Sequence, residues 1–181
     1  RYILRRPSPS ETLGGGVVID HQPKGRHKRF DENVLKSLES LAQGSPADVM
    51  LEASLASNVA PLKEIVTKSR LDASTAEAAL KELLETGQLV LLENGKLDIK
   101  SDTLAAALPH WNDLHGRVET ILDTFHKQFP LRRGIPREEL KSKLKVTPRI
   151  FNAVIKKLVE SNTLTDARGA VSRPGYEIKF D

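Results

Sequence analysis

Hydrophobic positions recur with a helical period in two stretches of the chain, residues 61–90 and 136–165. The stretches align without a gap at an offset of 75 residues, and 8 of 30 positions are identical. In each, a proline opens a short helix, a capping residue (Asp72 or Thr147) follows, and a longer helix carries apolar side chains at i, i+3, i+4, i+7 and i+8. Because an internal repeat indicates architecture directly, the pattern predicts two copies of one module.

Each copy of the repeat is followed by a strand, a turn and a second strand. "QLVLLENGKLDI" predicts a hairpin around Asn94-Gly95, and "TLTDARGAVSRPGYEI" predicts one around Arg168-Gly169. A further helix is expected before each copy, at residues 47–57 and 113–129. Three helices and a β-hairpin are the order of a winged-helix domain, in which a β wing follows a helix-turn-helix.

The expected fold class is therefore mainly α with small β, formed by tandem winged-helix domains that follow a remnant β-hairpin of a β-barrel. "RYILRR" and "LGGGVVID" predict the two strands of that hairpin, which would be marginal alone. The glycine triplet at 14–16 would let the strand bend or let another backbone approach closely. The expected domains are barrel strands (1–22), a basic connector and helix (23–44), winged-helix domain 1 (45–100), a linker (101–112) and winged-helix domain 2 (113–181).

Composition narrows the function classes. The chain has no cysteine, which excludes disulfides and thiolate metal sites and favours a cytoplasmic location. No apolar run is long enough to span a membrane, and the histidine spacings do not match a zinc helix, so neither a membrane nor a metal is expected. Residues 130–181 carry 12 basic and 6 acidic side chains, a net charge of +6, which favours a polyanionic partner.

The exposed face of the longer helix in the second copy carries Arg149, Asn152 and Lys156, which share one side at i, i+3 and i+7. Basic side chains gain affinity by releasing counterions from phosphates. The nucleic-acid-contact candidates are Arg132, Arg133, Lys141, Lys143, Lys145, Arg149, Asn152, Lys156 and Lys157, with Arg26, Lys28 and Arg29 of the connector as weaker candidates. The first copy has Glu77 at the centre of the equivalent face, which would repel phosphate and favours a spacer role.

Aromatic residues are too few for a platform on which single-stranded bases stack. Phe125, Phe129 and Phe151 fall on apolar stripes and are expected in the core. Trp111 is expected to pack the two modules together. Contact with phosphates is therefore the more plausible mode of nucleic-acid binding.

No catalytic centre is expected. "LGGGVVID" lacks the lysine and hydroxyl of a phosphate-binding P-loop, and a strand follows it rather than a helix. The acidic pair Glu138-Glu139 lies in the first turn of a helix, where carboxylates offset the helix dipole. The sequence therefore predicts no catalytic and no cofactor-binding residues.

Two segments resemble the selenocysteine-specific elongation factor family, SelB. "RYILRRPSPSETLGGGVVID" resembles the last strands of the family's third domain, a barrel like that of elongation factor Tu. "LHGRVETILDTFHKQFPLRRGIPREELKSKL" (114–144) resembles its winged-helix region. The resemblance implies a parent that uses GTP and magnesium to deliver selenocysteyl-tRNA to the ribosome at recoded UGA codons. It also implies an arm of four winged helices whose last pair holds an mRNA hairpin.

The chain departs from that plan, because it lacks the GTPase motifs and has two winged helices, which by position resemble the first pair. The resemblance therefore implies a monomeric, non-catalytic arm that faces ribosomal RNA, tRNA or the mRNA hairpin. An independent tandem winged-helix DNA-binding regulator is the alternative, and it predicts a basic recognition helix in both copies. A protein-interaction scaffold, the third reading, predicts no binding to nucleic acid.

Overall fold

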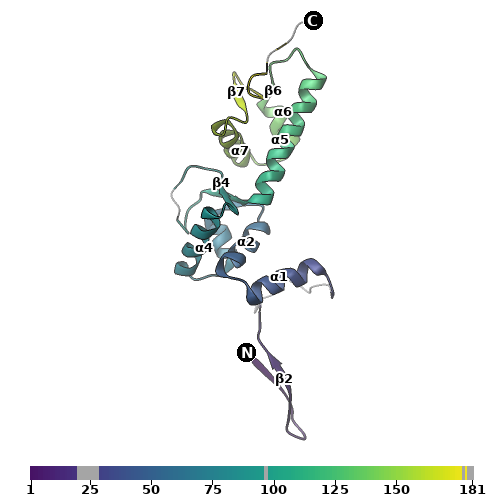
Figure 1. Cartoon of the computed structure of the whole chain (residues 1–181), viewed down its shortest axis with the longest axis vertical. Helices are drawn as coiled ribbons and strands as arrows, with labels where there is room; N and C mark the ends of the chain where they lie inside the picture. The colour runs from purple at the N-terminus through teal and green to yellow at the C-terminus, as the bar shows by residue number, and fades with distance from the viewer. Residues whose placement is uncertain (20–28, 96–97, 177, 179–181) are drawn as a thin grey trace.

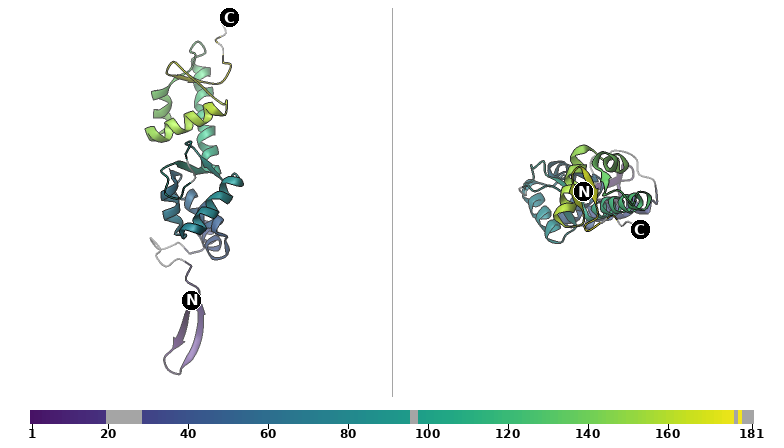
Figure 2. Two further views of the ribbon diagram at one scale, coloured as in Figure 1. Left: turned by 90° about the vertical axis from the view of Figure 1, so that its left-hand side faces the viewer. Right: turned by 90° about the horizontal axis from the view of Figure 1, so that it is seen from above.

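The computed structural model describes residues 1–19, 29–95, 98–176 and 178. An N-terminal hairpin extends away from the body, and two helical modules follow it, stacked end to end (Figures 1 and 2). Helices dominate, and the strands form one two-stranded and two three-stranded sheets. The predicted fold class, mainly α with small β, is confirmed.

The hairpin pairs β1 (Tyr2–Arg6) with β2 (Glu11–Gly16) in antiparallel register. A Cβ at Gly15 would lie 2.6 Å from the carbonyl oxygen of Tyr2, so this position needs glycine for a close backbone approach. Strand β2 ends at Gly16, earlier than expected, and Gly16 lies opposite Tyr2, the first residue of β1. Helix α1 (Glu32–Gln43) follows, and Asp31 Oδ1 accepts a hydrogen bond from Val34 N (3.4 Å), as an N-cap residue does.

Two modules make up the remainder of the described fold. The first contains α2 (Pro46–Leu55), β3 (Val59–Pro61), α3 (Leu62–Ser69), α4 (Ala73–Glu85), β4 (Leu89–Leu91) and β5 (Leu104–Ala107). The second contains α5 (Leu108–Gln128), β6 (Ile135–Pro136), α6 (Arg137–Leu144), α7 (Pro148–Glu160), β7 (Thr165–Ala167) and β8 (Ala170–Ser172).

The repeat seen in the sequence is confirmed residue by residue. Helices α3 and α6, and likewise α4 and α7, begin and end at positions that differ by the offset of 75. Both short helices end in a left-handed residue, Arg70 (φ 58°) or Lys145 (φ 55°). Both predicted caps form, because Asp72 accepts from Thr75 N at 3.1 Å and Thr147 accepts from Ile150 N at 3.4 Å.

The wings of the two modules differ. The second is the predicted hairpin, in which Arg168 (φ 53°) and Gly169 (φ 77°) form the turn between β7 and β8. In the first module the predicted hairpin at Asn94-Gly95 is wrong, because β4 pairs with β5, with Leu91 opposite Ala105. The expected linker at 101–112 is instead this strand, followed at once by α5.

Strand β5 lies in the middle of the sheet β3-β5-β4 and is buried on both faces. Ala105 belongs to the core of the first module, whereas Leu104 and Ala106 belong to the core of the second. Successive side chains of a strand point to opposite faces, so one strand supplies both cores. Small alanine side chains fit this tight layer, which explains why an Ala-rich stretch is a strand and not a linker.

Aromatic side chains follow the expectations with one exception. Trp111 packs against the core to which both modules contribute, as predicted. Phe125 and Phe151 are buried (1% and 2% exposed), but Phe129 is 41% exposed because α5 ends one residue before it. Phe129 was therefore wrongly assigned to the core.

Leu104→Ala should lower the free energy of unfolding by about 2–5 kcal/mol, as expected for truncation of a buried leucine. Amide hydrogen exchange should quicken in both modules, because Leu104 (3% exposed) projects from the first module into the second core. Leu35→Ala, at a 47% exposed position of α1, is the control and should change stability by less than about 0.5 kcal/mol. Faster exchange in the first module alone would contradict a shared core.

Candidate nucleic-acid interface

Arg149, the central candidate of the basic helix α7, binds the first module. Its Nε and Nη2 atoms donate to the two carboxylate oxygens of Glu93 at 3.0 and 2.8 Å, and Nη2 also donates to the carbonyl oxygen of Asp102 at 2.6 Å. Glu93 Oε2 accepts a further hydrogen bond from Leu104 N (3.1 Å). Planar two-point contacts of this kind are the strong form of an arginine–carboxylate pair, so Arg149 fixes the modules relative to each other.

The charges at this contact stabilise one another. The hydrogen bonds from Arg149 hold the pKa of the Glu93 carboxyl below its usual value, and the same contact raises the pKa of Arg149. A hydrogen bond and ion pair with Lys63, at 2.7 Å, lower the pKa of Asp102. The contact is therefore fully ionised at neutral pH.

Other side chains of α7 contact either the first module or elements of their own module. Glu160 accepts a hydrogen bond from Asn94 Nδ2 (3.3 Å) and so faces the first module, whereas Lys157 Nζ lies 6.0 Å from the ring centre of Trp111 on α5 of its own module. Asn152 faces the wing of its own domain, where its Oδ1 accepts from Arg137 Nη2 (2.8 Å). The side chain of Lys156 is 61% exposed, and its Nζ lies 3.9 Å from Glu160 Oε1.

The remaining candidates do not form one patch. On α6, Lys141 pairs with Glu138 and Lys143 pairs with Glu139 at 3.1 Å, which neutralises much of their charge. The guanidinium of Arg132 lies 4.8 Å from the ring centre of Phe129. Within the described part of the chain, Arg133 and Lys145 have no ion-pair partner and Arg29 is exposed. Arg26 and Lys28 lie outside the described residues.

The sequence did not indicate the contacts that join the wing to α7. Arg137 forms an ion pair with Asp166 on β7, and its backbone N donates to the carbonyl oxygen of Gly169 (3.1 Å). Arg168 is exposed at the wing turn. The dipeptide Arg168-Gly169 signalled a turn, but only the pairing of β6 with β8 brings that turn beside α6.

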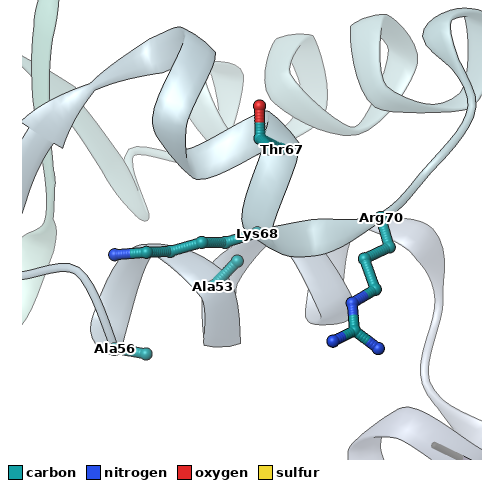
Figure 3. Close-up of a pocket in the computed structure, with 5 residues that line it drawn as sticks. All are labelled: Ala53, Ala56, Thr67, Lys68 and Arg70. Carbon is teal, nitrogen blue, oxygen red and sulfur yellow. The ribbon is translucent and has the colours of Figure 1, made fainter. Parts of the chain in front are cut away.

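A cavity of about 460 Å³ in the first module lies between α2 and α3 and is lined by Ala53, Ala56, Thr67, Lys68 and Arg70 (Figure 3). Lys68 pairs with Glu64 at 2.8 Å and donates to Ser57 Oγ at 3.0 Å. Lys68 and Arg70 extend in different directions (Figure 3), so the lining lacks the converging polar groups of a small-molecule site. Across the described ranges, no group of three or more histidine and acidic side chains is placed to hold a metal ion.

Residues 108–172 have the order of elements that defines a winged-helix domain: helix, strand, helix, helix and a two-stranded wing. Residues 120–172 match the family model of the winged helix of elongation factor SelB. The match supports a SelB-like region in this part of the chain. None of the curated proteins matches the chain. Among the described helices, none is both long and apolar enough to cross a membrane.

Glu93→Gln should lower the free energy of unfolding at pH 7 by up to about 1 kcal/mol, the range for partly exposed ion pairs. The pKa of Glu93 is lowered on folding, so its contribution is present above the ordinary value of 4.5 and is lost as the pH falls through the folded value. Urea unfolding at pH 7 and pH 3 should therefore show the wild type and the variant converging at the lower pH.

Glu85→Gln is the matched control, because Glu85 lies 3.9 Å from Lys81 in an exposed pair within one helix. Its stability should stay within about 0.5 kcal/mol of the wild type at both pH values. A difference between wild type and Glu93→Gln that persists unchanged at pH 3 would show that the carboxylate charge is not what stabilises the contact.

Proposed function

We propose that this chain is a non-catalytic arm of a selenocysteine-specific elongation factor and that the arm faces RNA. The observation that carries the proposal is the match of residues 120–172 to the SelB winged helix, on a domain with a strongly basic sequence. In such a factor, GTP and magnesium act in a domain outside this chain. The whole protein would deliver selenocysteyl-tRNA to the ribosome at recoded UGA codons, in the cytoplasm.

The N-terminal hairpin supports a connection to a further β domain. Ile3, Leu4 and Leu13 are 57–68% exposed, although apolar side chains of this size are usually covered. In the part of the chain that the structure describes, the hairpin's strands pair only with each other. We assign residues 1–22 to the closing strands of a barrel whose other strands would cover these side chains.

A DNA-binding regulator is the weaker alternative. Such a protein would present basic recognition helices from both modules, but α4 has Glu77 where α7 has Asn152. The end-to-end stacking of the modules also places the first residues of α7 against the first module, where Arg149 is bound. A spacer role for the first module and an RNA-facing role for the second fit these features better.

The test is binding of the full chain to four labelled probes over a range of KCl concentrations: a tRNA, an mRNA stem-loop, a ribosomal RNA fragment and a DNA duplex. Binding to at least one RNA should weaken steadily with salt, because released counterions supply the affinity. Tight, sequence-specific binding to the DNA duplex would favour the regulator. Failure to bind any probe at low salt would overturn the RNA-facing role.

A further inference from the structure

Some charged side chains of α7 contact the first module, and others are exposed and can contact a binding partner. The two-point contact of Arg149 with Glu93 commits that guanidinium to the first module, and Glu160 also contacts this module through Asn94. Beyond Arg149, the helix carries Asn152 and the largely exposed Lys156, whose Nζ lies 3.9 Å from Glu160 Oε1. Helix geometry places residues four apart on the same side, so these two form one strip.

Arg137 connects this strip to the wing. Its side chain donates to Asn152 and pairs with Asp166, and its backbone N donates to the Gly169 carbonyl oxygen in the wing turn. Arg168, the neighbour of Gly169 in the turn, is exposed and has no ion-pair partner among the described residues. The wing and α7 therefore both contact the same arginine.

The polar groups that this surface presents are hydrogen-bond donors. A guanidinium can only donate, so the amide of Asn152 turns its oxygen toward Arg137, and the NH₂ group of this exposed residue remains as a donor. Arg168 and Lys156 also only donate. The nearby carboxylates are engaged, Asp166 by Arg137, and Glu160 by Asn94 and by a longer contact of 3.9 Å with Lys156. A surface of donors fits a partner composed of acceptors.

We infer that Arg137, Asn152, Lys156 and Arg168, here called the wing surface, bind the phosphate backbone of a double-helical RNA segment. The inference rests on the proposed function and specifies where the arm touches RNA. The guanidinium carbon of Arg137 lies 5.4 Å from the ring centre of Phe151, and Phe151 is only 2% exposed. The ring of Phe151 is therefore not available for stacking on a base. Arg137 positions Asn152 and the wing, while Lys156 and Arg168 contact phosphates.

Two variants test the wing surface in the full chain, with a fluorescein-labelled RNA stem-loop as the probe. Arg168→Asn removes the charge and keeps a residue that tolerates positive φ, so the wing turn should persist. Lys156→Gln removes a charge from α7. Each variant should bind about tenfold more weakly at about 0.1 M KCl, and each should reduce the slope of log affinity against log salt by about 0.7–0.9.

The repeat supplies a matched control. Lys81 occupies the position of Lys156 in the first module, and each lysine lies 3.9 Å from a glutamate four residues later. Lys81→Gln should therefore leave affinity and slope unchanged. Thermal melting of all three variants should coincide with that of the wild type, since each changed side chain is exposed.

The outcomes separate the two proposals. If the wild type binds RNA and both Arg168→Asn and Lys156→Gln bind as tightly as the wild type, the proposed role of the wing surface is overturned. The proposal of an RNA-facing arm then stands. If Lys81→Gln weakens binding as much as Lys156→Gln, only total charge matters, and the wing surface is again overturned. If the wild type binds no RNA at low salt, the proposed function is overturned and the wing surface with it.

Discussion

Strand β5 is the element on which the rest of the structure depends. Its four residues are at most 3% exposed, and alternate side chains enter the cores of different modules. A strand that is buried on both faces cannot be moved without exposing apolar surface on each side, and burial of the Leu104 side chain alone contributes about 1.5–3 kcal/mol. The two winged-helix units are therefore joined through a common layer and not by a connector.

The contact between Arg149 and Glu93 adds a second connection between the modules, besides the shared strand β5. Hydrophobic burial is not directional, so it holds the modules together without selecting one rotation between them. The fork of a guanidinium on a carboxylate does select a geometry. It also changes what α7 can do, because the N-terminal turn, which in helix-turn-helix proteins reads base edges, is occupied by the neighbouring module. Any partner must then use the wing and the middle of the helix.

Sequence reasoning recovered the parts of the fold that are encoded locally. The caps Asp72 and Thr147, the helices of the repeat and the turn at Arg168-Gly169 all depend on neighbouring residues, and all are confirmed. It failed where the structure depends on distant pairing. The turn signal at Asn94-Gly95 predicted a local hairpin, but Leu89–Leu91 pairs with Leu104–Ala107, because that strand can be buried between two cores. The same pairing brings Glu93 to Arg149, a contact 56 residues apart that no local pattern reveals.

With a shared strand and the Arg149–Glu93 contact between them, the two winged-helix modules should behave as one rigid body. Measurement of ¹⁵N relaxation for backbone amides tests it most directly, because the ratio of transverse to longitudinal rates reports how each module tumbles. Amides of α2–α4 and of α5–α7 should fit one common rotational diffusion tensor, elongated along the stacking direction (Figure 2). Separate tensors with shorter correlation times for each module would contradict it.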